Sequence, residues 1–297
     1  MQLRPVRVED LSACVDVFYA AQDELYDRLN MPPLPRNPQS LERLFAHIVA
    51  TDPQLCWLAH DPRGVQAFGL AVRREQLHFL SFLFVRPEQQ GEGVGRRLLE
   101  RCLPEAAYRA TCVEAIQPVS TALYAGYGLA PRVPIYTLVG QPRTALAGPP
   151  ESLLLDSFAE LAAADHDALV TQVDSIDRMV LGIARPPEHR RWAEWGRQGF
   201  LLRDADAAVG YGYVHSSGRV GPVVALEQAL LLPLLAELLT RVTPLDAWQI
   251  LVPGPAQRTL AALLHAGLRL DGPPALFCAT QPGIDHARYL PATFALP

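Results

Sequence analysis

The chain has 297 residues, of which 49% are hydrophobic and 19% charged, and its formal net charge is -5. This length favours two domains, or one large one, with enough residues to bury a core. The composition excludes a disordered chain, which needs low hydrophobicity, and a coiled coil, which needs charge-rich heptads. All 26 basic residues are arginines, and 31 acidic residues outnumber them. This balance argues against a nucleic-acid partner.

The cysteines and the apolar stretches bear on location. Five cysteines are spread singly without a CxxC pair, which predicts buried thiols in a reducing compartment. The N-terminus is charged and lacks the apolar core of a signal peptide. The longest apolar stretch, residues 229–239, contains Pro233 and Glu237 and is too short to cross a bilayer. We therefore expect a cytoplasmic protein with no membrane partner and no metal.

The predicted elements alternate between strands and helices. A short strand (QLRPV) precedes a helix from about Val8 to Tyr19, and DPRG at residues 61–64 predicts a hairpin turn. The near-continuous apolar run HFLSFLFV, residues 78–85, predicts a strand covered on both faces. Three prolines and two glycines then interrupt the pattern, which predicts domains at 1–140 and 153–297 joined by a linker at 141–152.

The two halves show an internal repeat. Each contains a glycine-bearing strand, a second strand, a Leu-rich helix, a short strand and a helix closed by glycine. Gly69 and Gly128 in the first half are separated by nearly the same length of chain as Gly210 and Gly267 in the second. The matching order and spacing predict a duplicated α/β unit.

The most informative segment is VRPEQQGEGVGRRLL, residues 85–99. A buried strand ends at Val85, glycines follow, and an amphipathic helix begins at about Val94. Glycines let several N–H groups converge at a helix N-terminus, where the helix dipole favours an anion such as pyrophosphate. No GK[ST] follows, and no strand followed by Gly-x-Gly-x-x-Gly with an acidic residue about twenty positions on is present, so neither nucleotide motif is favoured.

These residues resemble the GNAT acetyltransferase superfamily, whose signature is V-x-P-x-x-[QR]-G-x-G-x-[GA] after an apolar strand and before a Leu-Leu helix. The matching residues are Val85, Pro87, Gln90, Gly91, Gly93, Gly95, Leu98 and Leu99. The second family signature, N-x-x-A-x-x-L-Y-x-x-x-G-F, resembles QPVSTALYAGYGL. There Leu123, Tyr124 and Gly128 are in register, whereas Gln117, Ser120 and Leu129 replace Asn, Ala and Phe.

The resemblance implies an α/β (α+β) fold of two tandem GNAT-like domains, each a mixed, mostly antiparallel sheet flanked by helices. It also implies that acetyl-CoA binds to the loop through backbone N–H groups and to the strand edge through its pantetheine amides. The expected cofactor-binding residues are Phe84, Val85, Gln90, Gly91, Glu92, Gly93, Val94, Gly95, Arg96 and Gln117. Arg96 or Arg97 is a candidate for a nucleotide phosphate, with a solvated helix face as the alternative.

The implied reaction is direct acetyl transfer to an amine, which loses a proton before it attacks, while the departing thiolate benefits from a proton donor. By resemblance the donor is Tyr124, with a core helix tyrosine as the alternative. The general base stays unassigned because the strand before the loop has no carboxylate; His78, Glu75 and Glu114 are candidates. Asp23, Glu24 and Asp27, expected just after the first helix, either attract a cationic amine or form a solvated face.

The C-terminal copy is expected to be degenerate. The segment after its strand, VVALEQALLLPLL, contains no glycine, and Leu263 stands where the first copy has Tyr124. In VDSIDRMVLG, Asp174, Asp177 and Arg178 are candidates for a substrate contact, with an ordinary helix start, where acidic residues favour the helix dipole, as the alternative. Trp192 and Trp195 are expected in a core or a domain interface.

The leading hypothesis is an acetyl-CoA-dependent N-acetyltransferase that acts on an amine of a small molecule or a peptide, as a monomer or a homodimer. The main alternative is a CoA-binding sensor or interaction protein whose catalysis has lapsed. Transfer of a longer acyl group, or transfer to a hydroxyl, depends on pocket volume that the sequence does not reveal.

Overall fold

The computed structural model describes all residues, 1–297, and divides them into two compact units, Met1–Thr111 and Cys112–Pro297. The expected linker, 141–152, lies inside the second unit, where it joins two strands. No helix has the length and hydropathy needed to span a membrane. All five cysteines are free thiols. We describe each unit separately.

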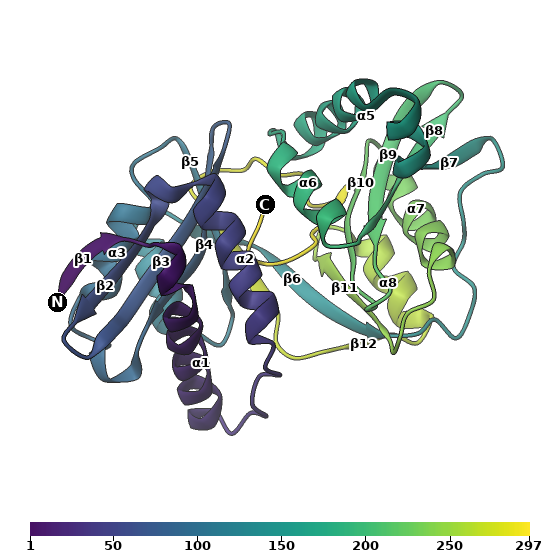
Figure 1. Cartoon of the computed structure of the whole chain (residues 1–297). Coiled ribbons are helices and arrows are strands. Elements are labelled where there is room, and N and C mark those ends of the chain that lie inside the picture. Colours follow the sequence, from purple (N-terminus) through teal and green to yellow (C-terminus); the bar gives the residue numbers. More distant parts are fainter. The chain divides into compact units, whose positions relative to one another are not determined.

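The first unit is a twisted sheet flanked by helices (Figure 1). Its strands follow the order β1-β2-β3-β4-β5, antiparallel except for the parallel β4–β5 pair. Its elements are β1 (Gln2–Pro5), α1 (Leu11–Arg28), α2 (Pro38–Thr51), β2 (Cys56–Asp61), β3 (Gly64–Arg74), β4 (Leu77–Val85), the 3-10 turn η3 (Pro87–Gln89), α3 (Val94–Cys102) and the first part of β5 (Tyr108–Glu114).

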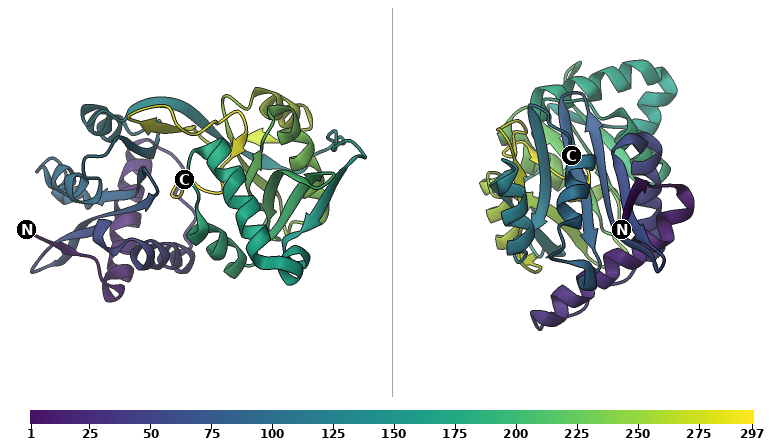
Figure 2. Two further views of the ribbon diagram at one scale, coloured as in Figure 1. Left: turned by 90° about the horizontal axis from the view of Figure 1, so that it is seen from above. Right: turned by 90° about the vertical axis from the view of Figure 1, so that its left-hand side faces the viewer.

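Side-chain alternation along β3 and β4 gives this sheet two apolar faces. Helices α1 and α2 cover one face and α3 covers the other (Figures 1 and 2). Phe84 on β4 makes an edge contact with Phe18 of α1 with ring centroids 4.8 Å apart, whereas its neighbour Val85 packs with Val94 of α3. The predicted doubly covered strand is therefore confirmed.

The second unit contains two sheets. One has the order β13-β6-β11, with β12 also paired to β6, and the other has the order β14-β10-β9-β8-β7. The elements are α4 (Pro118–Gly126), β6 (Ala130–Gly140), β7 (Leu153–Ser157), α5 (Phe158–Leu181), α6 (Pro186–Glu194), β8 (Gln198–Asp204), β9 (Ala207–Val214), β10 (Val220–Ala225), α7 (Gln228–Arg241), β11 (Trp248–Pro253), α8 (Gln257–His265), β12 (Arg269–Leu270), β13 (Ala275–Ala279) and β14 (Tyr289–Leu290).

The predicted repeat is visible in the order and packing of the elements. The run β2-β3-β4-α3-β5-α4 in the first half corresponds to β8-β9-β10-α7-β11-α8 in the second. Gly69 on β3 lies against Cys102 of α3, and Gly210 on β9 lies against Leu234 of α7, so both glycines allow a helix to pack closely on the sheet.

The first helix is longer than expected. The sequence predicts its end near Tyr19, but α1 continues to Arg28 and stops before Asn30, whose φ of 52° lies in the left-handed region. Asp23, Glu24 and Asp27 therefore belong to the last turns of α1 and do not follow it, contrary to the prediction. The carboxylate of Asp23 pairs with Arg36.

Candidate functional site

The loop between β4 and α3 has the geometry of an anion site. Gly91 and Gly93 have φ values of 82° and 75°, which L-residues with a side chain rarely adopt. The side-chain amide of Gln90 donates a hydrogen bond to the Val85 carbonyl (3.1 Å) and braces the start of the loop. The backbone N–H groups from Gly91 to Arg96 donate to no acceptor in the protein. They remain available to an external anion at the N-terminus of α3.

The other loop residues lie where the sequence places them. Helix α3 begins at Val94, which is buried, while Glu92, Arg96 and Arg97 are exposed. Gly95 lies in the first turn, and a Cβ there would stand 3.5 Å from the Val85 side chain, an ordinary contact. Space at this position is therefore sufficient for a methyl group, which would contact the Val85 side chain at the end of β4.

The end of β4 presents an open strand edge beside this loop. Pairing with β5 runs from Leu77–Tyr108 to Leu80–Thr111 and stops there, although β4 continues to Val85. Residues 82–85 keep their partners on β3 beyond a bulge at Ser81, but they have no strand on the other side within the first unit. Outward-facing amides of such an edge can pair with an extended ligand as with an added strand. Phe84 and Val85 lie on this edge.

Tyr124, the expected proton donor, lies on α4 in the second unit. Its side chain is only 5% exposed, and its hydroxyl makes no hydrogen bond within the protein. Burial raises the pKa of Tyr124 well above its usual range, so the phenol stays protonated at neutral pH. A protonated hydroxyl without an internal partner is suited to donate a proton.

Gln117 is the N-cap residue of α4. Its backbone carbonyl accepts hydrogen bonds from the N–H of Thr121 (3.0 Å) and from the hydroxyl of Thr121 (2.9 Å). Its side chain makes no capping hydrogen bond, so the amide is free for another role.

Among the candidate bases, His78 is the one on β4. It lies at the start of the strand, and Nδ1 of the half-buried ring has no hydrogen-bond partner. Burial lowers the pKa of His78, with a further contribution from Arg73, and this favours the neutral imidazole. A neutral ring with an unpartnered nitrogen is able to accept a proton.

The corresponding region of the second unit is closed. Only Leu226 and Glu227 separate β10 from α7, and the N–H of Leu226 already donates to the Val209 carbonyl (2.9 Å). The edge of β10 is paired with β14, through Val223–Leu290 and Val224–Tyr289. Neither a free row of amides nor an open edge is present there.

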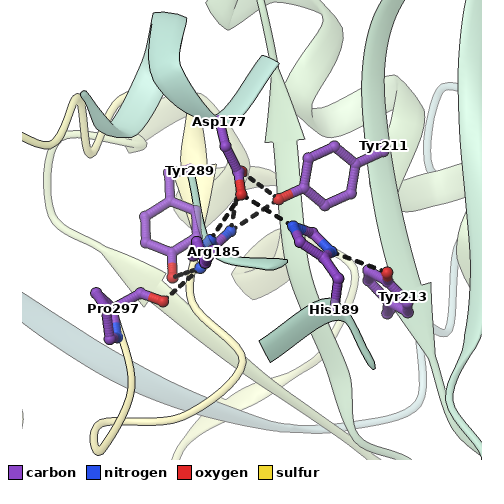
Figure 3. Close-up of polar contacts among 7 residues, drawn as sticks. All are labelled: Asp177, Arg185, His189, Tyr211, Tyr213, Tyr289 and Pro297. Carbon is purple, nitrogen blue, oxygen red and sulfur yellow. Dashed lines mark hydrogen bonds and ion pairs between the residues drawn. The ribbon is translucent and has the colours of Figure 1, made fainter. Parts of the chain in front are cut away.

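The second unit instead contains a buried polar cluster that sequence reasoning identified only in part (Figure 3). Its members are Asp177 of α5, Arg185 and His189 near and on α6, Tyr211 and Tyr213 of β9, and Tyr289 of β14. Asp177, a candidate for a substrate contact, is 0% exposed and pairs with Arg185 (3.0 Å). It lies near the C-terminal end of α5, so the alternative of a helix start is wrong, and its contacts are those of a buried structural residue.

The charges of this cluster are mutually compensated. Burial disfavours the ionised form of Asp177, but Arg185 and His189 outweigh it and lower the pKa of Asp177 to about 2. Arg185 also donates to the hydroxyls of Tyr211 (2.8 Å) and Tyr289 (3.1 Å) and to the Pro297 carbonyl. The network therefore ties the C-terminal segment to the core of the unit.

Trp192 lies on α6 and Trp195 is the C-cap residue of that helix. Both tryptophans pack against arginine side chains. Trp192 is 1% exposed and packs against Arg185, with 5.1 Å between the guanidinium carbon and the ring centroid. Trp195 is half-buried and lies under Arg191, with a corresponding distance of 4.1 Å.

One segment of the chain matches a known protein family. Residues 52–128 match the family model described as "Acetyltransferase (GNAT) domain". A search of curated proteins finds none that matches the chain.

Several solved structures share the fold along nearly the whole chain. A Pyrococcus horikoshii protein assigned as an acetyltransferase is 16% identical with a TM-score of 0.74, covering 99% of this chain and 95% of that one. A GCN5-related N-acetyltransferase from Sphaerobacter thermophilus is 18% identical with a TM-score of 0.61, covering 97% and 98%. A tandem GNAT protein from the clavulanic acid biosynthesis pathway is 15% identical with a TM-score of 0.53, covering 95% and 99%.

Proposed function

Because the chain carries a GNAT acetyltransferase domain and has the fold of tandem GNAT proteins, we propose that it is an acetyl-CoA-dependent N-acetyltransferase. The acceptor is a primary amine of a small molecule or a peptide. The observation that carries the proposal is the row of free backbone N–H groups from Gly91 to Arg96 beside the open edge of β4. The second unit lacks both features, so we assign one cofactor site per chain.

The residues of the first unit fit two parts of acetyl-CoA, the anionic pyrophosphate and the amide-bearing pantetheine arm. The free amides of Gly91, Glu92, Gly93, Val94, Gly95 and Arg96 bind the pyrophosphate, and Gln90 fixes the loop. The backbone of Phe84 and Val85 pairs with the pantetheine amides. The exposed guanidinium of Arg96 or Arg97 is available to a further phosphate. We assign the side chain of Gln117 to the cofactor by family resemblance.

Acetyl-CoA supplies the acyl thioester, and the protein positions it and moves protons. The amine nitrogen forms a bond to the thioester carbonyl carbon, the C–S bond breaks, and the amine loses a proton to a base. Tyr124 donates its hydroxyl proton to the departing sulfur and regains one from solvent. Its raised pKa keeps the hydroxyl protonated until the sulfur gains charge. His78 is a candidate base on the grounds of its unpartnered Nδ1.

The second candidate function is a CoA-binding sensor without catalysis. It is favoured by one observation, the absence of any carboxylate on β4, whose sequence is LHFLSFLFV. Both functions require the cofactor site, so they differ only in turnover.

Calorimetric titration with acetyl-CoA tests the cofactor site. The expected result is one site per chain, retained in Gly95→Ala and weakened at least about 100-fold in Gly95→Glu, which adds a negative charge in the first turn of α3 next to the anion-binding amides. The two variants share one backbone position, and thermal unfolding checks that both are folded. Two sites per chain would contradict the assignment of a closed second unit, and no binding would refute the proposal.

Release of CoA, followed with a thiol reagent, separates the enzyme from the sensor. Spermidine, lysine, kanamycin and an alanine-terminated peptide serve as amine probes. Turnover with any of them, reduced about 10- to 100-fold in kcat by Tyr124→Phe, supports the enzyme. Tyr127→Phe, three residues away, is the matched control. Binding without turnover across a broad amine panel favours the sensor.

A further inference from the structure

The second unit contains a cavity of about 650 Å³ bounded by α5, α6 and the start of β8. This volume is within the range of roughly 300–1,000 Å³ that small-molecule sites occupy. Helix α5 is broken beside it, at Asp165 (φ −156°, ψ 97°), and the Asp165 carboxylate caps the second segment by accepting the Ala168 N–H (3.0 Å). Ala162 and His166, on either side of the break, both line the cavity.

The wall formed by α6 and β9 is held by the buried cluster described above (Figure 3). His189 and Tyr213 line the cavity, with His189 Nδ1 2.9 Å from the Tyr213 hydroxyl and His189 Nε2 2.9 Å from the Asp177 carboxylate. Asp177 accepts, so Nε2 carries a proton, and Nδ1 lies at hydrogen-bond distance from the Tyr213 hydroxyl. The Tyr213 oxygen keeps acceptor capacity, and its orientation is fixed before any ligand binds.

Positive charge without an acidic partner lies at the β8 end of the cavity. Arg197, which lines it, donates to the Gly221 carbonyl and has no carboxylate within ion-pair distance. Arg219 lies close enough to lower the pKa of Arg197 further, to about 10, after the main effect of burial. A partly buried cation without a counter-charge is able to pair with an anionic group of a ligand.

We propose that this cavity binds an amphipathic monocarboxylate. The carboxylate pairs with Arg197, and the apolar body lies along the α5 side chains Phe158, Leu169 and Val173. Asp167 and Asp174 also line the cavity and would repel a second carboxylate on the ligand. The site is confined to the second unit, so the inference goes beyond the acetyl transfer proposed for the chain and does not rest on it.

Calorimetry with three probes of equal chain length tests the head group. Octanoate, 1-octanol and octylamine differ only in charge and hydrogen bonding. The expected result is one octanoate per chain, bound about 10-fold or more tightly than either of the others, as a charge-assisted hydrogen bond provides. Equal affinity of all three, a preference for octylamine, or no binding would overturn the proposal.

Two pairs of variants test the location. Ala193→Trp fills the cavity from α6 and should abolish octanoate binding, whereas Ala168→Trp, on an exposed position of α5 outside the lining, should not. Arg197→Gln should reduce octanoate affinity to that of octanol, with Arg258→Gln as the surface control. Octanoate binding that survives both Ala193→Trp and Arg197→Gln would place the ligand elsewhere and refute the site.

Discussion

The β4 edge of the first unit and the β10 edge of the second are built from equivalent elements but end differently. β4 loses its parallel partner after Leu80 and is followed by a glycine loop whose amides are free. Arg219, just before β10, forms an isolated parallel bridge to Gln249 of β11, and the edge of β10 is paired with β14 of the same chain. In the first unit the strand edge is therefore open to an external ligand. In the second unit the equivalent edge is paired with a strand of the chain itself.

The largest expected change in stability concerns the contacts that hold β14 in place beside β10. Arg185→Met leaves Asp177 buried without its guanidinium partner and releases Tyr289 of β14. The free energy of unfolding should fall by about 3–5 kcal/mol, as measured by urea denaturation. Arg241→Met, which removes a half-exposed pair with Glu237, should lower it by about 1 kcal/mol or less. A loss for Arg185→Met as small as that of the control would show that the network does not stabilise the closure.

The equivalent glycines Gly69 and Gly210 differ in the atoms that an added side chain would contact. A Cβ at Gly210 would lie 2.8 Å from the Val224 carbonyl, so backbone must move, whereas at Gly69 it would lie 2.6 Å from Sγ of Cys102, a side chain. We expect Gly210→Ala to destabilise by about 3 kcal/mol and Gly69→Ala by about 1 kcal/mol. Adding Cys102→Ala should relieve Gly69→Ala. A Gly69 variant as unstable as the Gly210 variant would contradict this difference.

The segment leading into β14 makes the second unit sensitive to acid. Burial lowers the pKa of His286 to about 4 from its usual 6.5, so the unfolded chain binds the proton more readily between these values. Stability is therefore lost as the pH falls below 6.5, by about 2 kcal/mol at pH 5. His286→Phe, which keeps a ring against Phe277, should flatten this slope in denaturation curves at pH 7 and pH 5. An unchanged slope would assign the acid sensitivity to other groups.

The smallest effects distinguish two glycines of the open loop. Gly93 has a positive φ, so Gly93→Ala should lower the free energy of unfolding by about 1 kcal/mol. Gly95 lies in the helix with room for a methyl group, and Gly95→Ala should raise it by about 0.5–1 kcal/mol. Thermal denaturation gives both signs. Shifts of the same sign would mean that backbone conformation does not separate the two positions.

Local signals carried most of the fold and the loop. The glycines at 91 and 93 predicted left-handed backbone, the start of α3 at Val94 was placed correctly, and the duplicated element order follows from patterns within each half. The end of α1 was placed too early. No glycine or proline follows Tyr19 directly, and the first stop signals in the sequence are Asn30 and Pro32, which agree with the observed end at Arg28.

The buried cluster was out of reach for a different reason. Arg185 and Tyr289 are more than a hundred residues apart in the chain, and only the pairing of β14 with β10 brings them together. No periodicity or motif records such a contact. What the sequence does contain is the alternation of Tyr211 and Tyr213 on one face of β9, a pattern that predicts a shared environment without naming the partners.

The placement of β6 has a consequence for where the chain can be divided. β6 stands between β11 and β13, and Leu138 is buried in the core of the second unit. A gene fragment ending at residue 140 would encode this strand with both edges bare and its apolar side chains exposed, a state that promotes aggregation. The chain is thus not divisible at residue 140 into two self-contained folding units.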